Sequence, residues 1–327
     1  MKKETVVKLS HPAKTYGYDN LGARQQSPGN LGVWGNYRFE INTDIDECDF
    51  WVVFESVPHA AKVSVPPGNT IAVLSEPAHY RDYTPEYVQQ FDWVFTWRDD
   101  ISFSNVLRSW CLDGWWLKRT YDQLKNDRIE KTADLCVIAS DRATVGGHRK
   151  RFAFINRLIG HFKDRLDVFG SIGGPWCSDK YATLRDYRYS IAIESLASPY
   201  YWTEKIADCF LTETMPVYYG CPNITDYFKP ESFVAIDIDD YKGSIQSIEK
   251  ALEENAYDKH RDLVVEAKHR ILDELQVFPH LVRLLESHRA RTNGAQRSKR
   301  ELVPAQKRIE LFGAAELERL VPARESS

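Results

Sequence analysis

The second half of the chain alternates short apolar segments with helical patterns, and this alternation constrains the fold most. Each apolar segment is long enough for one buried strand; they are residues 134–140, 166–170, 190–193, 216–219 and 233–236. Between the first two, apolar residues recur at helical spacing from Phe152 to Phe162. Repeated strand–helix units predict a parallel sheet covered by helices on both faces. The sequence therefore favours an α/β fold, in which ligands bind beyond the carboxyl ends of the strands.

One strand–loop–helix unit places charged residues at that edge. The strand 190–193 ends on Glu194, and the next helix is expected to begin with Thr203 as its N-cap and Glu204 and Lys205 in its first turn. Free N–H groups at a helix N-terminus bind phosphate, whereas the helix dipole disfavours a lysine there. Lys205 therefore fits a site for an anionic ligand. The alternative interpretation is an ordinary solvated first turn.

The composition limits the class of protein. The chain has 327 residues, 43% of them hydrophobic, which suffices for one large or two medium domains. Its net charge of −4 implies no general attraction to nucleic acid. We identify no signal peptide and no apolar stretch near the roughly 20 residues that span a bilayer. The six cysteines lack C-x-x-C spacing and indicate free thiols in a reducing compartment, so a cytoplasmic protein is expected.

The first half also contains apolar segments that predict buried strands, at residues 50–54, 70–74 and 91–97. Residues 113–131, aromatic and then strongly charged, predict a connection between two units. The predicted organisation is an N-terminal domain, a C-terminal domain and a basic, amphipathic tail, with the ranges 1–128, 129–285 and 286–327. The tail segment 304–323 predicts either a helix on a membrane surface or a terminal helix packed on its own protein.

Several motifs of the second half resemble the donor-site signature of the α-1,3/1,4-fucosyltransferases (glycosyltransferase family 10). That signature reads approximately F-E-N-S, D-Y-V-T-E-K, V-P-V-x-x-G and S-F-I. The chain has I-E-S, Y-W-T-E-K, M-P-V-Y-Y-G and E-S-F-V in the same order, at residues 193–195, 201–205, 215–220 and 231–234. The order of several motifs carries the resemblance, which extends over about residues 74–241.

The resemblance implies a GT-B architecture, in which two Rossmann-like domains face each other across a cleft. It implies an inverting enzyme that transfers L-fucose from GDP-β-L-fucose to a glycan hydroxyl, expected as an α-1,3 linkage to GlcNAc or Glc of a lactose-type or N-acetyllactosamine-type acceptor. Other expectations from the residues are a GT-B enzyme with another nucleotide sugar and a non-catalytic binding protein. The partners would be a nucleotide sugar and an acceptor oligosaccharide, with peripheral membrane contact through the tail as an open alternative.

The resemblance also implies site residues. Lys205 would neutralise the diphosphate and Glu204 would bind a ribose hydroxyl. Arg151 would be the second phosphate cation, because residues 151–158 resemble the family's R-x-x-[FY]-x-x-x-L segment; Arg149 and Lys150 are its rivals. The remaining residues expected in the donor site are Glu194, Ser195 and Tyr201. The catalytic base would be Glu76, at the end of the strand 70–74, with Glu55 and His79 as alternates.

Two positions depart from the family pattern, and one acidic run resembles a metal-binding motif. Ser195 stands where the family has Asn, and Trp202 where it has Val or Ile. The D-I-D-D run at residues 237–240 looks like a D-x-D metal motif. The run follows a strand, and the fucosyltransferases have comparable acidic residues after that strand but use no metal. The resemblance therefore implies no metal and no cofactor.

Overall fold

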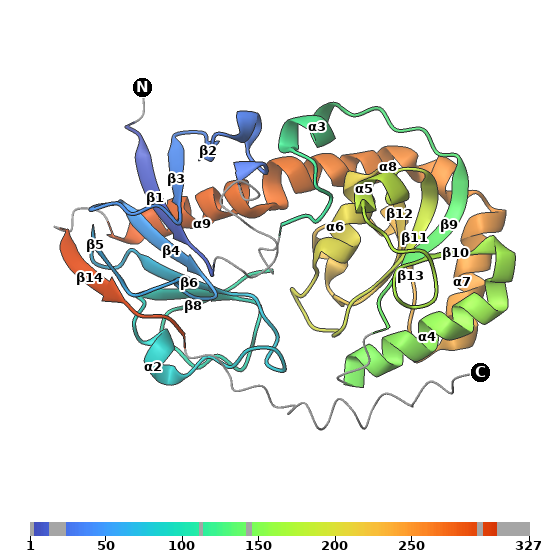
Figure 1. The fold of residues 1–327 in the computed structure, drawn as a ribbon, viewed down its shortest axis with the longest axis horizontal. Helices are drawn as coiled ribbons and strands as arrows, with labels where there is room; N and C mark the ends of the chain where they lie inside the picture. Colours follow the sequence, from blue (N-terminus) through green and yellow to red (C-terminus); the bar gives the residue numbers. More distant parts are fainter. Residues whose placement is uncertain (1–2, 13–23, 111–113, 142–145, 293–296, 306–327) are drawn as a thin grey trace, which may run out of the picture.

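Two mainly parallel sheets lie side by side in the computed structural model, which describes residues 3–12, 24–110, 114–141, 146–292 and 297–305 (Figure 1). The first sheet has the strand order β2-β3-β1-β4-β6-β7-β8, and the second has the order β10-β9-β11-β12-β13. Within the described residues, every neighbouring pair in these sheets is parallel except β2 with β3. The predicted α/β fold with parallel sheets is confirmed.

The first sheet is buried on both faces, which explains its continuous apolar strands. Its strands are β1 (Thr5–Ser10), β2 (Val33–Trp34), β3 (Tyr37–Ile41), β4 (Phe50–Phe54), β6 (Thr70–Leu74), β7 (Trp93–Thr96) and β8 (Val106–Arg108). Along β4, Val52 packs in the core cluster on one face, while Trp51 and Val53 pack in the cluster on the other. The strands predicted at 50–54, 70–74 and 91–97 correspond to β4, β6 and β7.

The C-terminal part of the chain covers this first sheet. Helix α9 (Val277–Thr292) packs on one face through Phe278 and Leu281. On the other face, β14 (Ser298–Leu302) pairs antiparallel with β5 (Ala61–Val65) and buries Leu302. Residues up to 302, part of which we assigned to a tail, thus contribute to the first core. The predicted domain boundaries stay predictions, and residues 306–327 of the tail lie outside the described residues.

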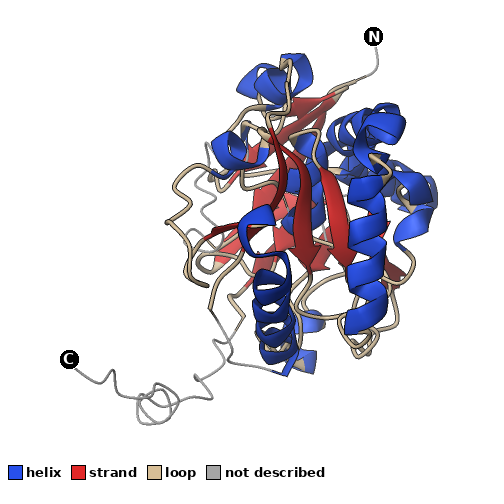
Figure 2. Cartoon of the chain, turned by 90° about the vertical axis from the view of Figure 1, so that its right-hand side faces the viewer, coloured by secondary structure: helices blue, strands red, loops and turns tan. Residues whose placement is uncertain are grey.

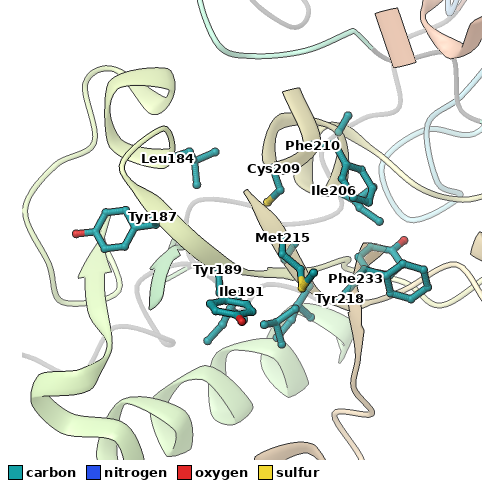
Figure 3. Close-up of a cluster of buried hydrophobic side chains, with 14 of the residues drawn as sticks. Leu184, Tyr187, Tyr189, Ile191, Ile206, Cys209, Phe210, Met215, Tyr218 and Phe233 are labelled. Atoms are coloured by element: carbon teal, nitrogen blue, oxygen red, sulfur yellow. The ribbon is translucent and has the colours of Figure 1, made fainter. Parts of the chain in front are cut away.

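The second sheet lies between helices, as Figure 2 shows from the side. Its strands are β9 (Ala133–Ile138), β10 (Asp167–Phe169), β11 (Tyr187–Ile193), β12 (Met215–Tyr219) and β13 (Val234–Ala235). The α-helices after β8, other than α9, are α3 (Tyr121–Asn126), α4 (Gly146–Phe162), α5 (Lys180–Leu184), α6 (Glu204–Leu211), α7 (Tyr241–Glu253) and α8 (Ala256–Arg270). Figure 3 shows part of the core, where Ile191 and Met215 of the sheet lie in one cluster with Ile206 and Phe210 of α6.

Short elements complete the described structure. They are α2 (Pro85–Val88), the 3₁₀ segments η1 (Pro28–Asn30), η2 (Lys163–Arg165), η3 (Ile224–Asp226) and η4 (Pro230–Ser232), and the π-helical η5 (Ile271–Leu275). The described cysteines, Cys48, Cys136, Cys177, Cys209 and Cys221, have free thiols, in line with the expectation for them. Across the described ranges, no helix combines the length and the apolar character that crossing a membrane requires.

Candidate functional site

Helices α4 and α6 begin at the carboxyl edge of the second sheet, on either side of the place where the strand order reverses. The chain moves from β9 outward to β10, and from β11 in the opposite direction to β12 and β13. The strand order therefore reverses between β9 and β11, which are direct neighbours. Ligands of open α/β sheets bind at such a switch point. Helix α4 follows strand β9 in the chain, and helix α6 follows strand β11. Both helices therefore begin at the carboxyl edge of the sheet.

A glycine holds the start of α4 against the end of β11. A Cβ atom on Gly147 would lie 1.9 Å from the carbonyl oxygen of Ser195. Real Cβ atoms do not approach an oxygen so closely, since packing leaves no room for overlap. The glycine thus allows the backbone of α4 to contact the loop after β11 directly.

We expect Gly147→Ala to lower the free energy of unfolding by about 1–3 kcal/mol, because the new methyl group must displace α4 or the Ser195 loop. Gly160→Ala on the same helix is the matched control: apart from its chain neighbours and the backbone of its own helix, no atom lies within 4 Å of the added Cβ, so it should be neutral or slightly stabilising. Denaturant unfolding of both variants tests this; equal stabilities would contradict the close contact.

Glu194, Thr203 and Lys205 form a buried network between β11 and α6. The backbone N–H of Thr203 donates to Oε1 of Glu194 at 2.8 Å, and the Thr203 hydroxyl lies 2.9 Å from both carboxylate oxygens. Lys205 Nζ lies 3.1 Å from Glu194 Oε2 and donates to Thr203 Oγ1 at 3.1 Å. The Glu194 side chain has no exposed surface, whereas Lys205 keeps a quarter of its side chain exposed. The network therefore fixes the ammonium of Lys205 at the open edge of the sheet.

The charges of this network shift the pKa values of its members. Burial raises the pKa of Glu194, and Lys205 offsets part of that rise. Burial alone would lower the pKa of Lys205, but the carboxylates Glu194 and Glu204 outweigh it and hold that pKa above its ordinary value. Lys205 is therefore a cation at any physiological pH, as neutralising a phosphate requires.

Glu204, predicted to bind ribose, lies beside two lysines. Its carboxylate is 3.4 Å from Lys205 Nζ and keeps a fifth of its side chain exposed. Burial raises its pKa, but Lys205 and Lys180 outweigh this and lower it overall. Lys180 itself pairs at 2.7 Å with Asp208, one turn further along α6. Glu204 thus stays ionised and able to accept hydrogen bonds from a ligand hydroxyl.

Arg151, on the first turns of α4, has unused hydrogen-bonding capacity. Its Nε is buried and has no hydrogen-bond partner among the described residues. Burial lowers its pKa, and the nearby Glu194 and Glu204 partly restore it. A buried donor without an acceptor is costly unless a ligand supplies one. The structure brings Arg151 close to Glu194 and Glu204, and its role as a phosphate cation stays a prediction.

The rivals of Arg151 point to other contacts. Lys150 Nζ donates to both carboxylate oxygens of Asp239, at 2.9 and 3.0 Å. Arg149 is exposed. In the D-I-D-D run, Asp240 caps α7 through the N–H of Gly243, and Asp237 accepts from the N–H of Asp239. Its carboxylates therefore have structural partners, and in the described part of the chain no three His, Cys, Asp or Glu residues gather as a metal site would require.

Tyr201 links the site to the first half of the molecule. Its hydroxyl lies 3.4 Å from the Ser195 hydroxyl, and its ring packs against Trp97, with 4.6 Å between the ring centroids. Leu196 contacts the same pair. Trp97 follows β7 of the first sheet and donates its indole N–H to Ser75 O at 2.6 Å. This contact joins the loop before Glu76 to the loop before α6.

Glu76 lies opposite the α6 cluster, on the loop after β6. Its pKa is raised to about 6, chiefly by burial, while Arg81 and Lys205 act to lower it and Glu204 to raise it. The contact of Trp97 with Tyr201 and its hydrogen bond to Ser75 O place the Glu76 loop beside the loop before α6, in line with the influence of Glu204 and Lys205 on this pKa. Its carboxylate makes no hydrogen bond or ion pair with another described residue. A partly buried carboxylate with a pKa near neutrality suits a general base.

The two alternates for the base have different environments. Glu55 is fully buried, and Ser75, Glu76 and other donors occupy its carboxylate. His79 is exposed, and its ring lies near those of Tyr80 and His148. The Tyr80 hydroxyl lies 2.9 Å from His148 Nε2, which adds a second link between the Glu76 loop and α4. Sequence patterns gave no sign of this link, because its partners are 68 positions apart.

Trp202, one of the two departures from the family pattern, belongs to the core. It is buried and packs on the rings of Trp110, Tyr227 and Phe228, at centroid distances of 6.5, 5.6 and 5.6 Å. The larger side chain is thus accommodated by an aromatic cluster behind the site. Ser195, the other departure, remains at the site edge through its contact with Tyr201.

Part of the chain is similar in sequence to known fucosyltransferases. Residues 128–262 match the family model described as the glycosyltransferase family 10 (fucosyltransferase) C-terminal domain. The α-(1,3)-fucosyltransferase FucT of Helicobacter pylori is 32% identical over 71 residues, which are 22% of this chain and 14% of that protein. The match thus spans well under two thirds of that relative's length.

Solved structures share the fold. A crystal structure of an α1,3-fucosyltransferase with GDP has a TM-score of 0.52 at 17% identity, covering 82% of this chain and 83% of that chain. An α1,3-fucosyltransferase structure gives 0.51 at 19% identity, covering 80% and 82%. An α-glucosyltransferase in complex with UDP and DNA gives 0.53 at 9% identity, covering 86% and 98%. The expected GT-B architecture is confirmed.

Proposed function

We propose that this chain is an inverting fucosyltransferase that uses GDP-β-L-fucose, because residues 128–262 match the family model described as the glycosyltransferase family 10 (fucosyltransferase) C-terminal domain. The observation that carries the proposal is the cationic edge of the second sheet. There the ammonium of Lys205 is fixed by Glu194 and Thr203, and Arg151 has a buried Nε without an acceptor. A nucleotide diphosphate supplies the negative charge that this edge lacks.

The proposed reaction assigns one role to each of these groups. Glu76 accepts the proton of an acceptor hydroxyl, whose oxygen forms a bond to the anomeric carbon of fucose. The bond from that carbon to the β-phosphate oxygen breaks on the opposite face, and the electron pair leaves with GDP. Lys205 and Arg151 stabilise the charge that develops on the departing diphosphate. Attack from the opposite face inverts the anomeric configuration.

The remaining predicted residues either contact the donor or support Lys205. Glu204, ionised and partly exposed, accepts a hydrogen bond from a ribose hydroxyl, while Tyr201 and Ser195 border the donor from the β11 loop. Glu194 was expected to bind the donor as well. Since its side chain is fully buried and its oxygens are occupied by Thr203 and Lys205, we assign it to holding Lys205 instead.

The proposal needs no metal ion. Its support is that side-chain cations stand at the nucleotide edge, while Asp239 and Asp240 of the D-I-D-D run already bind Lys150 and the N-terminus of α7. For the acceptor, we propose a lactose-type or N-acetyllactosamine-type glycan with an α-1,3 linkage to GlcNAc or Glc, on the basis of the family resemblance. Contact of the tail with a membrane stays a prediction, since residues 306–327 lie outside the described part.

A different nucleotide sugar is the second candidate, because Ser195 replaces the family's Asn. Thermal-shift measurements with GDP, UDP and CMP in EDTA separate the two. We expect GDP alone to raise the melting temperature, by an amount that grows with its concentration. GDP release from GDP-fucose should then depend on lactose or N-acetyllactosamine. Protection by UDP instead would support the second candidate, and GDP binding without acceptor-dependent turnover would indicate a non-catalytic binding protein.

A further inference from the structure

Glu55 has an unusual backbone conformation at the end of β4. Its φ is 60°, in the left-handed region that non-glycine residues rarely adopt. The conformation is held by the Glu55 N–H, which donates to Val73 O at 2.9 Å, and by the Tyr87 hydroxyl, which donates to Glu55 O at 2.9 Å. Backbone strain of this kind persists where the surroundings enforce it, and it is concentrated at functional sites.

The carboxylate of Glu55 is directed at the loop that carries Glu76. Its Oε1 accepts from the N–H and the hydroxyl of Ser75, both at 2.7 Å, and from the N–H of Glu76 at 3.3 Å. Its Oε2 accepts from the Tyr83 hydroxyl and lies 3.5 Å from Arg81 Nη1. With both oxygens occupied and only 1% of the residue exposed, Glu55 has no free site for a substrate proton.

The same loop is held from its other side. Trp97 Nε1 donates to Ser75 O at 2.6 Å, and Arg98 Nη1 donates to Glu76 O at 3.3 Å. The N–H and the C=O of both loop residues are therefore fixed, and the Glu76 carboxylate is the part of this loop pair left to face a ligand. The strand pairing of β4 with β6 ends at Phe54 and Val73. The hydrogen bonds from Ser75 and Glu76 to the Glu55 carboxylate therefore lie beyond the end of the sheet.

We propose that Glu55 is a positioning residue, which acts on the reaction by fixing the Glu76 backbone so that the Glu76 carboxylate faces the α6 edge. The inference rests on the proposed function of Glu76 as the base. It extends that function to a residue that touches neither donor nor acceptor. Proton transfer requires the base within hydrogen-bond distance of the hydroxyl, so a displacement of about 1 Å can cost up to 100-fold in rate.

Glu55→Gln tests the proposal, with Glu86→Gln, an exposed carboxylate of α2, as the matched control. We expect Glu55→Gln to lower kcat by about 10- to 100-fold, while KM for GDP-fucose and thermal protection by GDP stay at wild-type values, because the donor residues lie on the second sheet. Glu86→Gln should behave as wild type. Unchanged kcat in a folded Glu55→Gln protein overturns the proposal.

A double-mutant cycle separates positioning from an independent role. If Glu55 acts only through Glu76, then Glu55→Gln/Glu76→Gln is no slower than Glu76→Gln alone. A double variant far slower than Glu76→Gln overturns the proposal, although Glu76 remains the base. Full activity of Glu76→Gln itself would instead refute the proposed function from which the inference starts.

Ser75→Ala provides a second test should Glu55→Gln fail to fold. It removes one hydroxyl donor to Glu55 and leaves the buried carboxylate with its other partners. We expect a smaller drop in kcat, by a few-fold, again with unchanged GDP protection. A Ser75→Ala enzyme with wild-type kcat, or one that loses GDP protection in step with kcat, overturns the positioning role.

Discussion

Lys205→Met should lower kcat by about 10²–10³-fold, the usual effect of removing one preorganised donor from a developing negative charge. The side chain of Lys205 is partly exposed, whereas the carboxylate of its partner Glu194 is fully buried. In the proposed mechanism, loss of the ammonium removes the charge that balances the departing diphosphate. Acceptor-dependent GDP release at saturating GDP-fucose measures the effect.

The buried partner requires its own control, because Lys205→Met also leaves the Glu194 carboxylate without its cation. A broken buried pair costs about 3–5 kcal/mol of stability. The double variant Lys205→Met/Glu194→Gln removes that orphaned charge, so it should melt at a higher temperature than Lys205→Met while turnover stays low. Lys229→Met, which removes an exposed lysine paired with Glu266, should leave turnover unchanged. Recovery of turnover in the double variant would show that Lys205 serves stability only.

Glu76→Gln should lower kcat by about 10²–10⁴-fold, the contribution of a general base, and leave thermal protection by GDP intact. The wild-type enzyme should also show a pH dependence set by Glu76. Its pKa is raised to about 6, so the carboxylate accepts a proton only above that pH. The logarithm of kcat/KM should therefore rise with pH up to about 6 and then level off.

The pH profile of Glu76→Gln completes this test. Glutamine does not titrate, so the residual activity should lose the rise near pH 6. The same limb in both proteins would assign it to another group and contradict the role of Glu76. Loss of GDP protection in Glu76→Gln would also contradict it, since the donor is expected to bind the second sheet.

Much of the fold could be predicted because parallel strands buried on both faces are continuous apolar segments. Residues 50–54 and 70–74 match β4 and β6, and the helix from 152 to 162 is the C-terminal part of α4. The cluster of Glu194, Thr203 and Lys205 could be predicted as well, since it lies within twelve consecutive residues. Local order is thus sufficient to locate the edge of the site.

The rest depends on contacts that leave no local pattern. Helix α9 buries Phe278 and Leu281 against the first sheet, and nothing in the local sequence indicates which sheet it covers. Glu55 could be proposed as a carboxylate near the base, but its true partners, Ser75 and Tyr83, follow from β4 lying beside β6. The burial of Glu194 likewise follows from the packing of α6 on β11 and β12.

The most direct test of the central claim is a crystal structure of the protein with GDP, grown in EDTA. The claim is that Lys205 and Arg151 neutralise the leaving diphosphate at the switch point between β9 and β11. The structure should then place a phosphate oxygen within hydrogen-bond distance of Lys205 Nζ and of the Arg151 guanidinium. A diphosphate bound away from both side chains, for example beside Asp237 and Asp240, would contradict the claim.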